Sequence, residues 1–283
     1  MAVLIGTGDA DTLPGGGGAA DLVLGLGGND RAAGGGGGDL ILGGAGDDSL
    51  AGDGTALFVN FDAPSGDDLI FGGDGNDTIS GDSFFYNGPE GGTNTLFGGA
   101  GNDAITGGYG ADTISGDSGD DFIRGYGAAA PSPGGTASLR DRDLADLLLG
   151  GSGNDTIEGG GGRDTIDGGT GDDRLVGGAG VDALTGGPGA DRFVFAPTGA
   201  TGLPPDTGQG EGNRDVVTDF RPGEDLLDLS GYPRDDLNVR WEYDAAGDRT
   251  IVTYEDPRGA AFFPDLQIEL AGVRDLSLSD IIA

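Results

Sequence analysis

Residues 98–115 read GGAGNDAITGGYGADTIS, which is one nine-residue pattern written twice. The pattern is G-G-x-G-x-D-x-U-x, where U is apolar and x is variable. It recurs as GGDGNDTIS at 72–80 and as GGSGNDTIE at 150–158. Counted on its sixth residue, the unit occurs seventeen times between Gly6 and Val194, with Asp in sixteen units and Asn94 in one. A fixed period of this length predicts a solenoid built from one small structural unit per repeat.

Each part of the unit has a physical role. The glycines permit positive φ and close backbone approach, so six residues can turn tightly with carbonyl groups pointing inward. The eighth position is apolar in every unit, from Leu13 to Phe193, within three residues that form a minimal strand. A Gly-Asp linker needs no apolar residue in fixed phase. The regular phase therefore excludes disorder as the default state, despite 65 glycines and 13 prolines among 283 residues.

The composition removes several functions. The chain has no Lys, His or Cys, and its 49 acidic residues against 14 arginines give a net charge of −35. Zinc sites, disulfides, a Walker lysine and nucleophilic triads that use His are therefore excluded. The charge disfavours nucleic acid and anionic membranes and attracts divalent cations. No apolar run approaches the length of about 18 residues that a membrane span needs, and the N-terminus lacks the features of a secretory signal peptide.

The oxygen atoms of the repeat indicate the ion. Each turn offers one hard carboxylate among several backbone carbonyls, in a flexible loop. Such oxygen-only ligand sets suit Ca²⁺ better than Zn²⁺ or Cu²⁺.

These units resemble the RTX family, the repeats-in-toxin nonapeptides that bind Ca²⁺. The resemblance covers residues 6–194 and implies an all-β fold, a right-handed parallel β-roll solenoid with a small C-terminal β cap. In that family each unit is one turn and one strand, two units make a coil, and Ca²⁺ lies between units i and i+2 on one edge. We expect about seven to ten bound ions, held by Asp30, Asp39, Asp48, Asp77, Asp103, Asp112, Asp121, Asp155, Asp164, Asp173, Asp182 and Asp191.

Alternation of the units predicts two unequal edges. The fifth position is Asn or Asp in seven of the eight odd units from the third unit on, but in only one of the eight even units. Three even units have expanded turns, over 52–71, 81–97 and 125–149. The odd edge is therefore the regular one. An extra residue, Gly15, separates the first two units and makes the N-terminal phase uncertain from sequence.

We divide the chain into the repeat region 1–194, with its three expanded turns, and a C-terminal cap over 195–283. The cap resembles the end of RTX exoproteins such as the serralysin proteases, in DRFVF at 191–195, RDVVTDFRPGEDLLDLSGY at 214–232 and LAGVRDLSLSDIIA at 270–283. In that family the segment caps the roll and carries an uncleaved signal for type I secretion. The catalytic half of the serralysins has no counterpart here, and without His the protease activity is not carried over.

The cap itself reads as a small β structure. Predicted strands cover 192–196, 215–220, 225–230, 237–243, 249–255 and 265–270, with a hairpin turn at 244–248. Trp241, Tyr243 and Tyr254 are candidates for a sugar-stacking platform, although packing in the core of a small sandwich is favoured.

The function that we predict is a secreted, extracellular Ca²⁺-binding protein whose repeats fold into a β-roll on meeting Ca²⁺ outside the cell. Its expected partners are Ca²⁺ and a type I secretion exporter. An alternative is an adhesin or polysaccharide-binding matrix protein that contacts a glycan or cell-surface ligand through the expanded loops, where Phe58, Phe84 and Tyr86 lie. A polysaccharide-active enzyme using paired carboxylates is the least favoured class, because almost every Asp already has a place in the repeat. We therefore expect no enzymatic activity.

Overall fold

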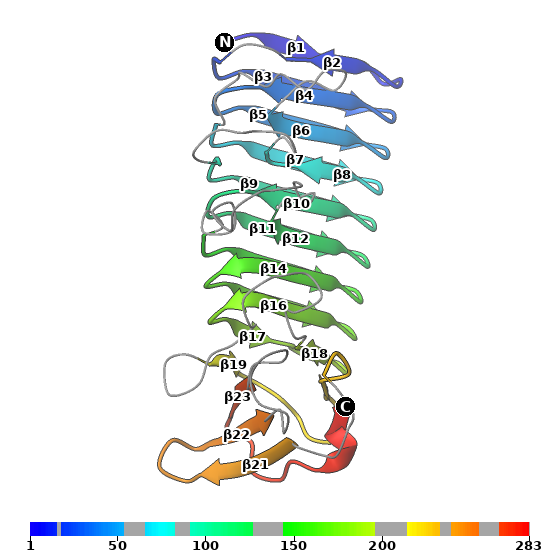
Figure 1. The fold of residues 1–283 in the computed structure, drawn as a ribbon. Coiled ribbons are helices and arrows are strands. Elements are labelled where there is room, and N and C mark those ends of the chain that lie inside the picture. Colours follow the sequence, from blue (N-terminus) through cyan, green and yellow to red (C-terminus); the bar gives the residue numbers. More distant parts are fainter. Residues whose placement is uncertain are drawn as a thin grey trace.

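The fold is a stack of short strands with turns on its two edges (Figure 1). The computed structural model describes residues 1–15, 18–53, 66–82, 91–126, 144–195, 214–232, 239–254 and 266–282. Successive strands alternate between two sheets, so each sheet receives every second unit. We call them the odd sheet and the even sheet, after the units whose strands they contain. This arrangement confirms the predicted all-β parallel roll.

The even sheet has thirteen strands within the described residues. In spatial order they are β1 (Val3–Ile5), β3 (Leu22–Gly27), β5 (Leu40–Ala45), β7 (Leu69–Asp74), β9 (Thr95–Ala100), β11 (Thr113–Ser118), β13 (Leu147–Ser152), β15 (Thr165–Thr170), β17 (Ala183–Thr185), β19 (Asp215–Val217), β23 (Leu266–Ala271), β22 (Arg249–Tyr254) and β21 (Val239–Asp244).

The odd sheet has eleven strands within the same ranges. They are β2 (Thr12–Pro14), β4 (Arg31–Gly35), β6 (Ser49–Asp53), β8 (Thr78–Ser80), β10 (Ala104–Gly108), β12 (Phe122–Tyr126), β14 (Thr156–Gly162), β16 (Arg174–Gly180), β18 (Arg192–Val194), β20 (Leu226–Asp228) and β24 (Ile281–Ile282). The 3-10 helix η3 (Leu278–Asp280) precedes the last strand.

The core is a ladder of the eighth-position side chains. Parallel pairing places each of them directly over its equivalent one coil away, as in Ile105 opposite Ile123 and Ile157 opposite Leu175. None of the seventeen is more than 8% exposed. The predicted inward phase is therefore confirmed, and each repeat adds one apolar side chain to a thin core.

The extra residue at Gly15 does not disturb the stacking. Leu13 pairs with Ala32 in the odd sheet, and the Asp11 N–H donates to the Asp30 carboxylate at 2.7 Å, as in later coils. Backbone pairing therefore keeps the phase of the strands on either side of the insertion.

The roll passes into the C-terminal region without a break in pairing. β19 pairs parallel with β17, and β20 pairs parallel with β18, so residues 214–228 supply one more coil. β23 continues the even sheet in parallel, after which β22 and β21 add two antiparallel strands at its end (Figure 1). The six predicted strands are all present, some of them shorter, and the 244–248 hairpin is confirmed. The division near residue 194 stays a prediction, since hydrogen bonding is continuous across it.

Most residues of the three expanded turns lie outside the described part of the chain. Phe58, Phe84 and Tyr86, which the sequence analysis assigned to a contact patch, are among them. No helix in the described ranges is long and apolar enough to cross a membrane.

Candidate metal centres

The sixth-position side chains form a continuous ladder along each edge. On the odd edge, each backbone N–H donates to the Oδ1 of the equivalent Asp one coil further on, at 2.7–3.0 Å from Asp11 to Asp225. The even edge repeats the arrangement from Asp21 to Asp215, with Asn94 taking one place. One carboxylate oxygen per unit is thereby used to hold neighbouring coils together.

The second carboxylate oxygen has no hydrogen-bond donor in much of this ladder. On the odd edge this is true of Oδ2 in eight successive units, none more than 3% exposed: Asp30, Asp48, Asp77, Asp103, Asp121, Asp155, Asp173 and Asp191. Oδ2 of Asp39, Asp68 and Asp182 on the even edge is in the same state. A buried, ionised oxygen without a donor is costly, and a bound cation is one way to remove that cost.

The first glycine of each unit leaves room beside this oxygen. A Cβ at Gly98 would collide with Asp103 Oδ2 and would lie 2.8 Å from the carbonyl oxygen of Gly116, one coil away. The carboxylate oxygen and the carbonyl oxygen thus both approach the backbone of residue 98 as closely as only a glycine permits. The same pair of oxygens lies beside the first glycine of most described units, and hard oxygen atoms of this kind suit Ca²⁺.

Burial raises the pKa of these carboxyl groups. It brings the pKa of Asp103 and Asp155 to about 7, with the neighbouring carboxylates adding to the shift and a backbone N–H opposing it. The pKa of Asp77 and Asp191 rises to about 6 for the same first reason. Each group is therefore held where a proton or a cation is needed to stabilise it.

Within the described residues, no three acidic side chains converge on a common point suitable for a metal ion. An ion between two coils would therefore take one or two carboxylates and complete its shell with backbone carbonyls. Figure 1 places these turns along the two edges of the stack.

A second ladder explains the unequal edges. On the odd edge, the fifth-position side chain accepts the backbone N–H of the fifth residue one coil later, as Asn102 does from Asp120 and Asp120 from Asn154. This ladder runs from Asn29 to Asp172 and ends where Ala190 donates its N–H, at 2.7–3.2 Å throughout. Only a side-chain oxygen is required, so Asn and Asp are equivalent in this position. The Asn and Asp residues found at the fifth position of odd units therefore serve to accept backbone N–H groups of the neighbouring coil.

The structure places all twelve predicted metal residues in the sixth-position ladders. It also adds two members that the repeat count missed, Asp215 and Asp225, which accept the N–H groups of Asp182 and Asp191 at 2.8 and 3.0 Å. The sequence pattern that would have identified them is short. In R-D-V-V at 214–217 and E-D-L-L at 224–227, the Asp stands two residues before an inward apolar residue, as in the repeat, but the glycines that precede it in the repeat are absent. The ladders therefore extend one coil into the predicted cap.

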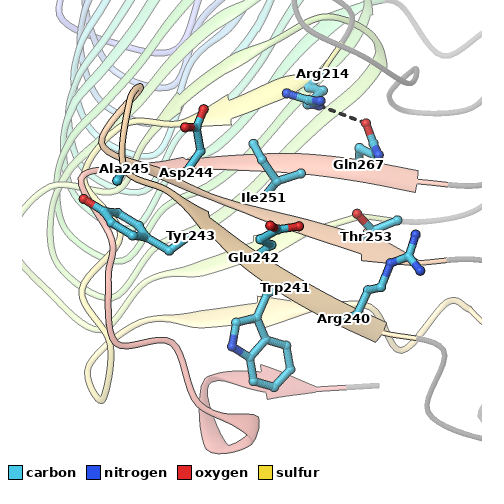
Figure 2. Close-up of a pocket in the computed structure, with 10 residues that line it drawn as sticks. All are labelled: Arg214, Arg240, Trp241, Glu242, Tyr243, Asp244, Ala245, Ile251, Thr253 and Gln267. Atoms are coloured by element: carbon cyan, nitrogen blue, oxygen red, sulfur yellow. Dashed lines mark hydrogen bonds between the residues drawn. The ribbon is translucent and has the colours of Figure 1, made fainter.

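The three candidate sugar-stacking aromatics do not share an exposed face. Tyr254 is 4% exposed, and its ring lies 4.6 Å from that of Tyr232. Trp241 packs against the core and points away from the face that carries Glu242 (Figure 2). The Tyr243 hydroxyl donates to Asp248 at 2.6 Å. Packing in the core, the favoured reading, is therefore correct for Tyr254 and in part for Trp241.

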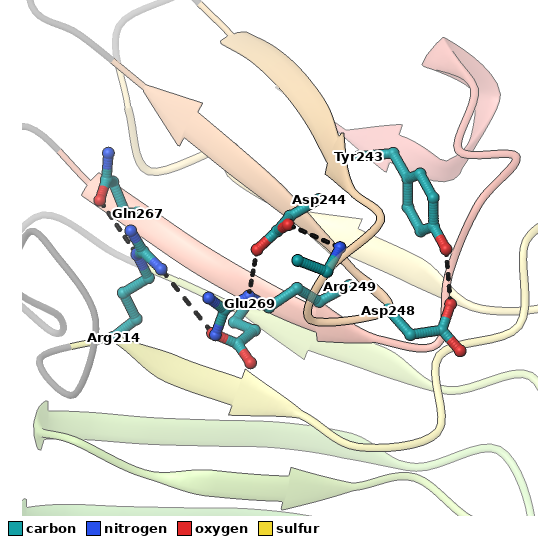
Figure 3. A network of polar contacts seen from close by, with 8 residues as sticks. Arg214, Tyr243, Asp244, Asp248, Arg249, Gln267 and Glu269 are labelled. Atoms are coloured by element: carbon teal, nitrogen blue, oxygen red, sulfur yellow. Dashed lines mark hydrogen bonds and ion pairs between the residues drawn. The ribbon is translucent and has the colours of Figure 1, made fainter.

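The opposite face of these strands carries a network of ion pairs (Figure 3). Arg249 contacts both Asp244 and Glu269 at 3.1 Å, and Arg214 lies 3.7 Å from Glu269. Arg214 also donates to Gln267 at 3.0 Å. The network joins β21, β22 and β23 to the residue that precedes β19.

The family of RTX calcium-binding nonapeptide repeats matches residues 24–55, 65–84, 90–123, 142–175 and 167–195. Among solved structures, the AlgE6R3 subunit of the Azotobacter vinelandii mannuronan C5-epimerase is 27% identical, with a TM-score of 0.30 over 49% of this chain and 73% of that one. The AlgE6R2 subunit of the same organism's mannuronan C5-epimerase is 26% identical, with a TM-score of 0.27 over 61% of this chain and 91% of that one. No curated protein matches the chain.

The fold and its two aspartate ladders define a Ca²⁺-binding β-roll. The chain is an RTX-type repeat protein.

Proposed function

We propose that this protein is secreted and that Ca²⁺, met outside the cell, drives the folding of its roll. The main observation behind this proposal is the row of eight buried Oδ2 atoms on the odd edge, none of which accepts a hydrogen bond. Each is an incomplete interaction in a chain of net charge −35. Bound cations complete these interactions and reduce the repulsion that opposes compaction.

The residues that would hold the ions are the sixth-position aspartates and the turn carbonyls beside them. Bound Ca²⁺ supplies positive charge and a flexible oxygen-coordination shell between coils. With seven gaps between the odd units three to seventeen, and fewer regular gaps on the even edge, we propose about seven to ten ions. Extracellular modules of this type bind at about 10⁻⁴ to 10⁻³ M, so the chain would stay unfolded in a low-Ca²⁺ cytosol.

A Ca²⁺ titration followed by far-ultraviolet circular dichroism tests the proposal. We expect a disordered spectrum in excess chelator and a cooperative change to a β spectrum at millimolar Ca²⁺. Mg²⁺ at the same ionic strength is the control, because its stricter octahedral geometry suits these turns poorly. A full β spectrum in chelator would refute Ca²⁺-driven folding.

Export by a type I route is part of the same proposal. It rests on the resemblance of residues 270–283 to RTX secretion signals, in a Cys-free, acidic chain. We propose a binding role rather than a catalytic one, because the buried aspartates of the repeats serve the two ladders.

One observation favours a contact site as a second candidate. Phe71 and Phe97, the last residues of the first two expanded units, stack with ring centroids 4.9 Å apart, and Phe71 is 38% exposed. Aromatic side chains that reach the surface of an acidic roll are a feature of binding surfaces. Binding of the Ca²⁺-loaded chain to a glycan array, and its loss in Phe71→Ser, would support an adhesin or matrix role.

A further inference from the structure

Two stacked even units carry Asp at the second position of the repeat. Asp53 lies in the unit over 52–71, and Asp82 lies in the next even unit, over 81–97. Strand pairing places Asp53 opposite Gly35, the second residue two units earlier, and the Asp53 N–H donates to the Gly81 carbonyl. Both units have expanded turns, and in both the expansion begins directly after this Asp.

The backbone at these two positions differs from the rest of the even edge. Second-position glycines such as Gly35 and Gly108 have φ of 115° and 128°. Neither Asp53 nor Asp82 has a positive φ. Both residues are buried, with 7% and 6% exposure. By contrast, Asp117 holds the second position on the odd edge with φ 70° and is exposed. The Asp53 and Asp82 side chains are therefore buried, whereas the second-position Asp on the odd edge is exposed.

Each carboxylate accepts a hydrogen bond from the far end of its own turn. Asp53 Oδ2 receives the Gly66 N–H at 3.3 Å, and Asp82 Oδ1 receives the Gly92 N–H at 3.2 Å. Asp82 Oδ2 also receives the Tyr109 N–H, one coil on, at 2.8 Å. These bonds leave Asp53 Oδ1 buried and without a donor.

β6 pairs with β8, with Ala51 opposite Ser80, and the Asp53 N–H donates to the Gly81 carbonyl, so Asp53 and Asp82 lie side by side at the ends of adjacent strands. Burial raises the pKa of Asp53 to about 9, and the neighbouring carboxylates of Asp68 and Asp82 add to that shift. Two buried carboxylates side by side, one of them with an oxygen that accepts no hydrogen bond, are stabilised by a shared proton or by a cation.

The sixth position of the same coil has changed as well. Asn94 stands where every other unit has Asp, and its Oδ1 accepts the Asp68 N–H at 3.0 Å. Its Nδ2 therefore takes the place of the Oδ2 of the other units, beside Gly81, where it donates to the Gly107 carbonyl at 3.5 Å. An amide N–H₂ cannot ligate a cation. In this unit the carboxylate is therefore at the second position, as Asp82, and not at the sixth, which Asn94 occupies.

We propose that Asp53 and Asp82 bind one divalent cation of the Ca²⁺ type between the first two expanded turns, at a site separate from the sixth-position ladders. This inference rests on the proposed Ca²⁺-binding function. Asp53 Oδ1 and the Asp82 carboxylate supply the charged ligands, and Asp68 adds negative potential beside them. The bound ion clamps the starting points of the two expanded turns to each other.

The test counts Ca²⁺ ions per chain by equilibrium dialysis at saturating Ca²⁺. We compare the full-length chain with the double variant Asp53→Asn, Asp82→Asn and with Asp117→Asn, a second-position control with one fewer acidic group. The double variant is expected to lose one ion and the control none. Asp53→Asn alone keeps an amide that can donate to Asp82, so it should fold even if the double variant does not, and it is expected to lose the same ion.

An unchanged ion count in Asp53→Asn, with folding intact, would overturn the proposal and leave a shared proton as the explanation of the pair. If the unaltered chain itself binds no Ca²⁺, the proposed function fails and this site fails with it. Loss of one ion in Asp117→Asn as well would also overturn it, because the effect would then follow charge rather than position.

Discussion

At the scale of single residues, the two oxygens of each sixth-position carboxylate have different tasks. Oδ1 accepts a backbone N–H from the neighbouring coil, and Oδ2 is left for a cation. An Asn in this position keeps the first task and loses the second, as Asn94 does naturally. Structural and ionic contributions can therefore be separated by an isosteric substitution.

Asp155→Asn is expected to raise the Ca²⁺ concentration at the folding midpoint by about two- to tenfold, because a ligand charge is lost while the ladder bond is kept. Asp120→Asn is the matched control. It makes the same charge change on the same edge, but the fifth-position ladder accepts Asn or Asp equally. Circular dichroism titrations measure both midpoints, and equal shifts would show that net charge rather than ligation controls folding.

The raised pKa values predict an opposite pH response with and without Ca²⁺. The pKa of Asp103 and Asp155 moves from 3.8 to about 7 on burial, so the ion-free fold binds more protons than the unfolded chain between these values. Its stability therefore falls as the pH rises from about 4 to about 7. Ca²⁺ requires the ionised carboxylates, so its midpoint concentration should rise as the pH falls below about 7.

Ca²⁺ titrations at about pH 8 and about pH 5.5, together with circular dichroism spectra of the ion-free chain at the same two values, check this prediction. A Ca²⁺ midpoint that does not change with pH would contradict it.

At the scale of the repeat element, a glycine sets the distance between carboxylate and carbonyl. A Cβ at Gly98 would collide with Asp103 Oδ2 and approach the Gly116 carbonyl, although φ at this residue is not positive. The requirement here is space and not backbone conformation. Gly8 has nothing within 4 Å of its Cβ position and serves as a comparison.

Gly98→Ala is expected to destabilise the Ca²⁺-loaded roll by about 1–3 kcal/mol and to raise the Ca²⁺ midpoint, because the coil must open to admit the methyl group. Gly8→Ala is expected to change neither quantity. Urea denaturation at saturating Ca²⁺ gives the free energies of unfolding. A stability of Gly98→Ala equal to that of the unaltered chain would show that the turn yields without cost.

At the scale of the whole molecule, the roll and the C-terminal region share their two sheets. Ile281 pairs with Leu227, and the Leu229 N–H donates to the Ile282 carbonyl, so the last residues are part of the end of the roll. Asp280 accepts hydrogen bonds from Gly223 and Ser277, at 2.9 and 2.8 Å. The segment that resembles a secretion signal is thus folded into the structure, and an exporter would meet it only in the unfolded, Ca²⁺-free chain.

Deletion of the final ~50 residues, a length typical of such signals, is expected to abolish export while the remaining repeats still bind Ca²⁺. Secretion assays in cells with a type I exporter and Ca²⁺ binding by the purified truncation measure the two effects. The full-length chain carrying Asp155→Asn is the control, since it weakens Ca²⁺ binding without touching the signal. Continued secretion of the truncated chain would refute the type I route.

The sequence by itself determined the solenoid, the inward phase from Leu13 to Phe193 and the assignment of units to two edges. Each of these depends on a local pattern repeated at a fixed period, and parallel stacking converts that period directly into geometry. The twelve predicted metal residues all lie in the ladders for the same reason.

Only the tertiary structure decided the features that break the period. Asp215 and Asp225 lie outside the nine-residue period, and strand pairing reveals their register. Asp53 and Asp82 lie side by side because β6 pairs with β8, and only the folded structure shows that both side chains are buried there. Side chains separated by variable loops share no spacing in the sequence, so their meeting depends on the folded backbone.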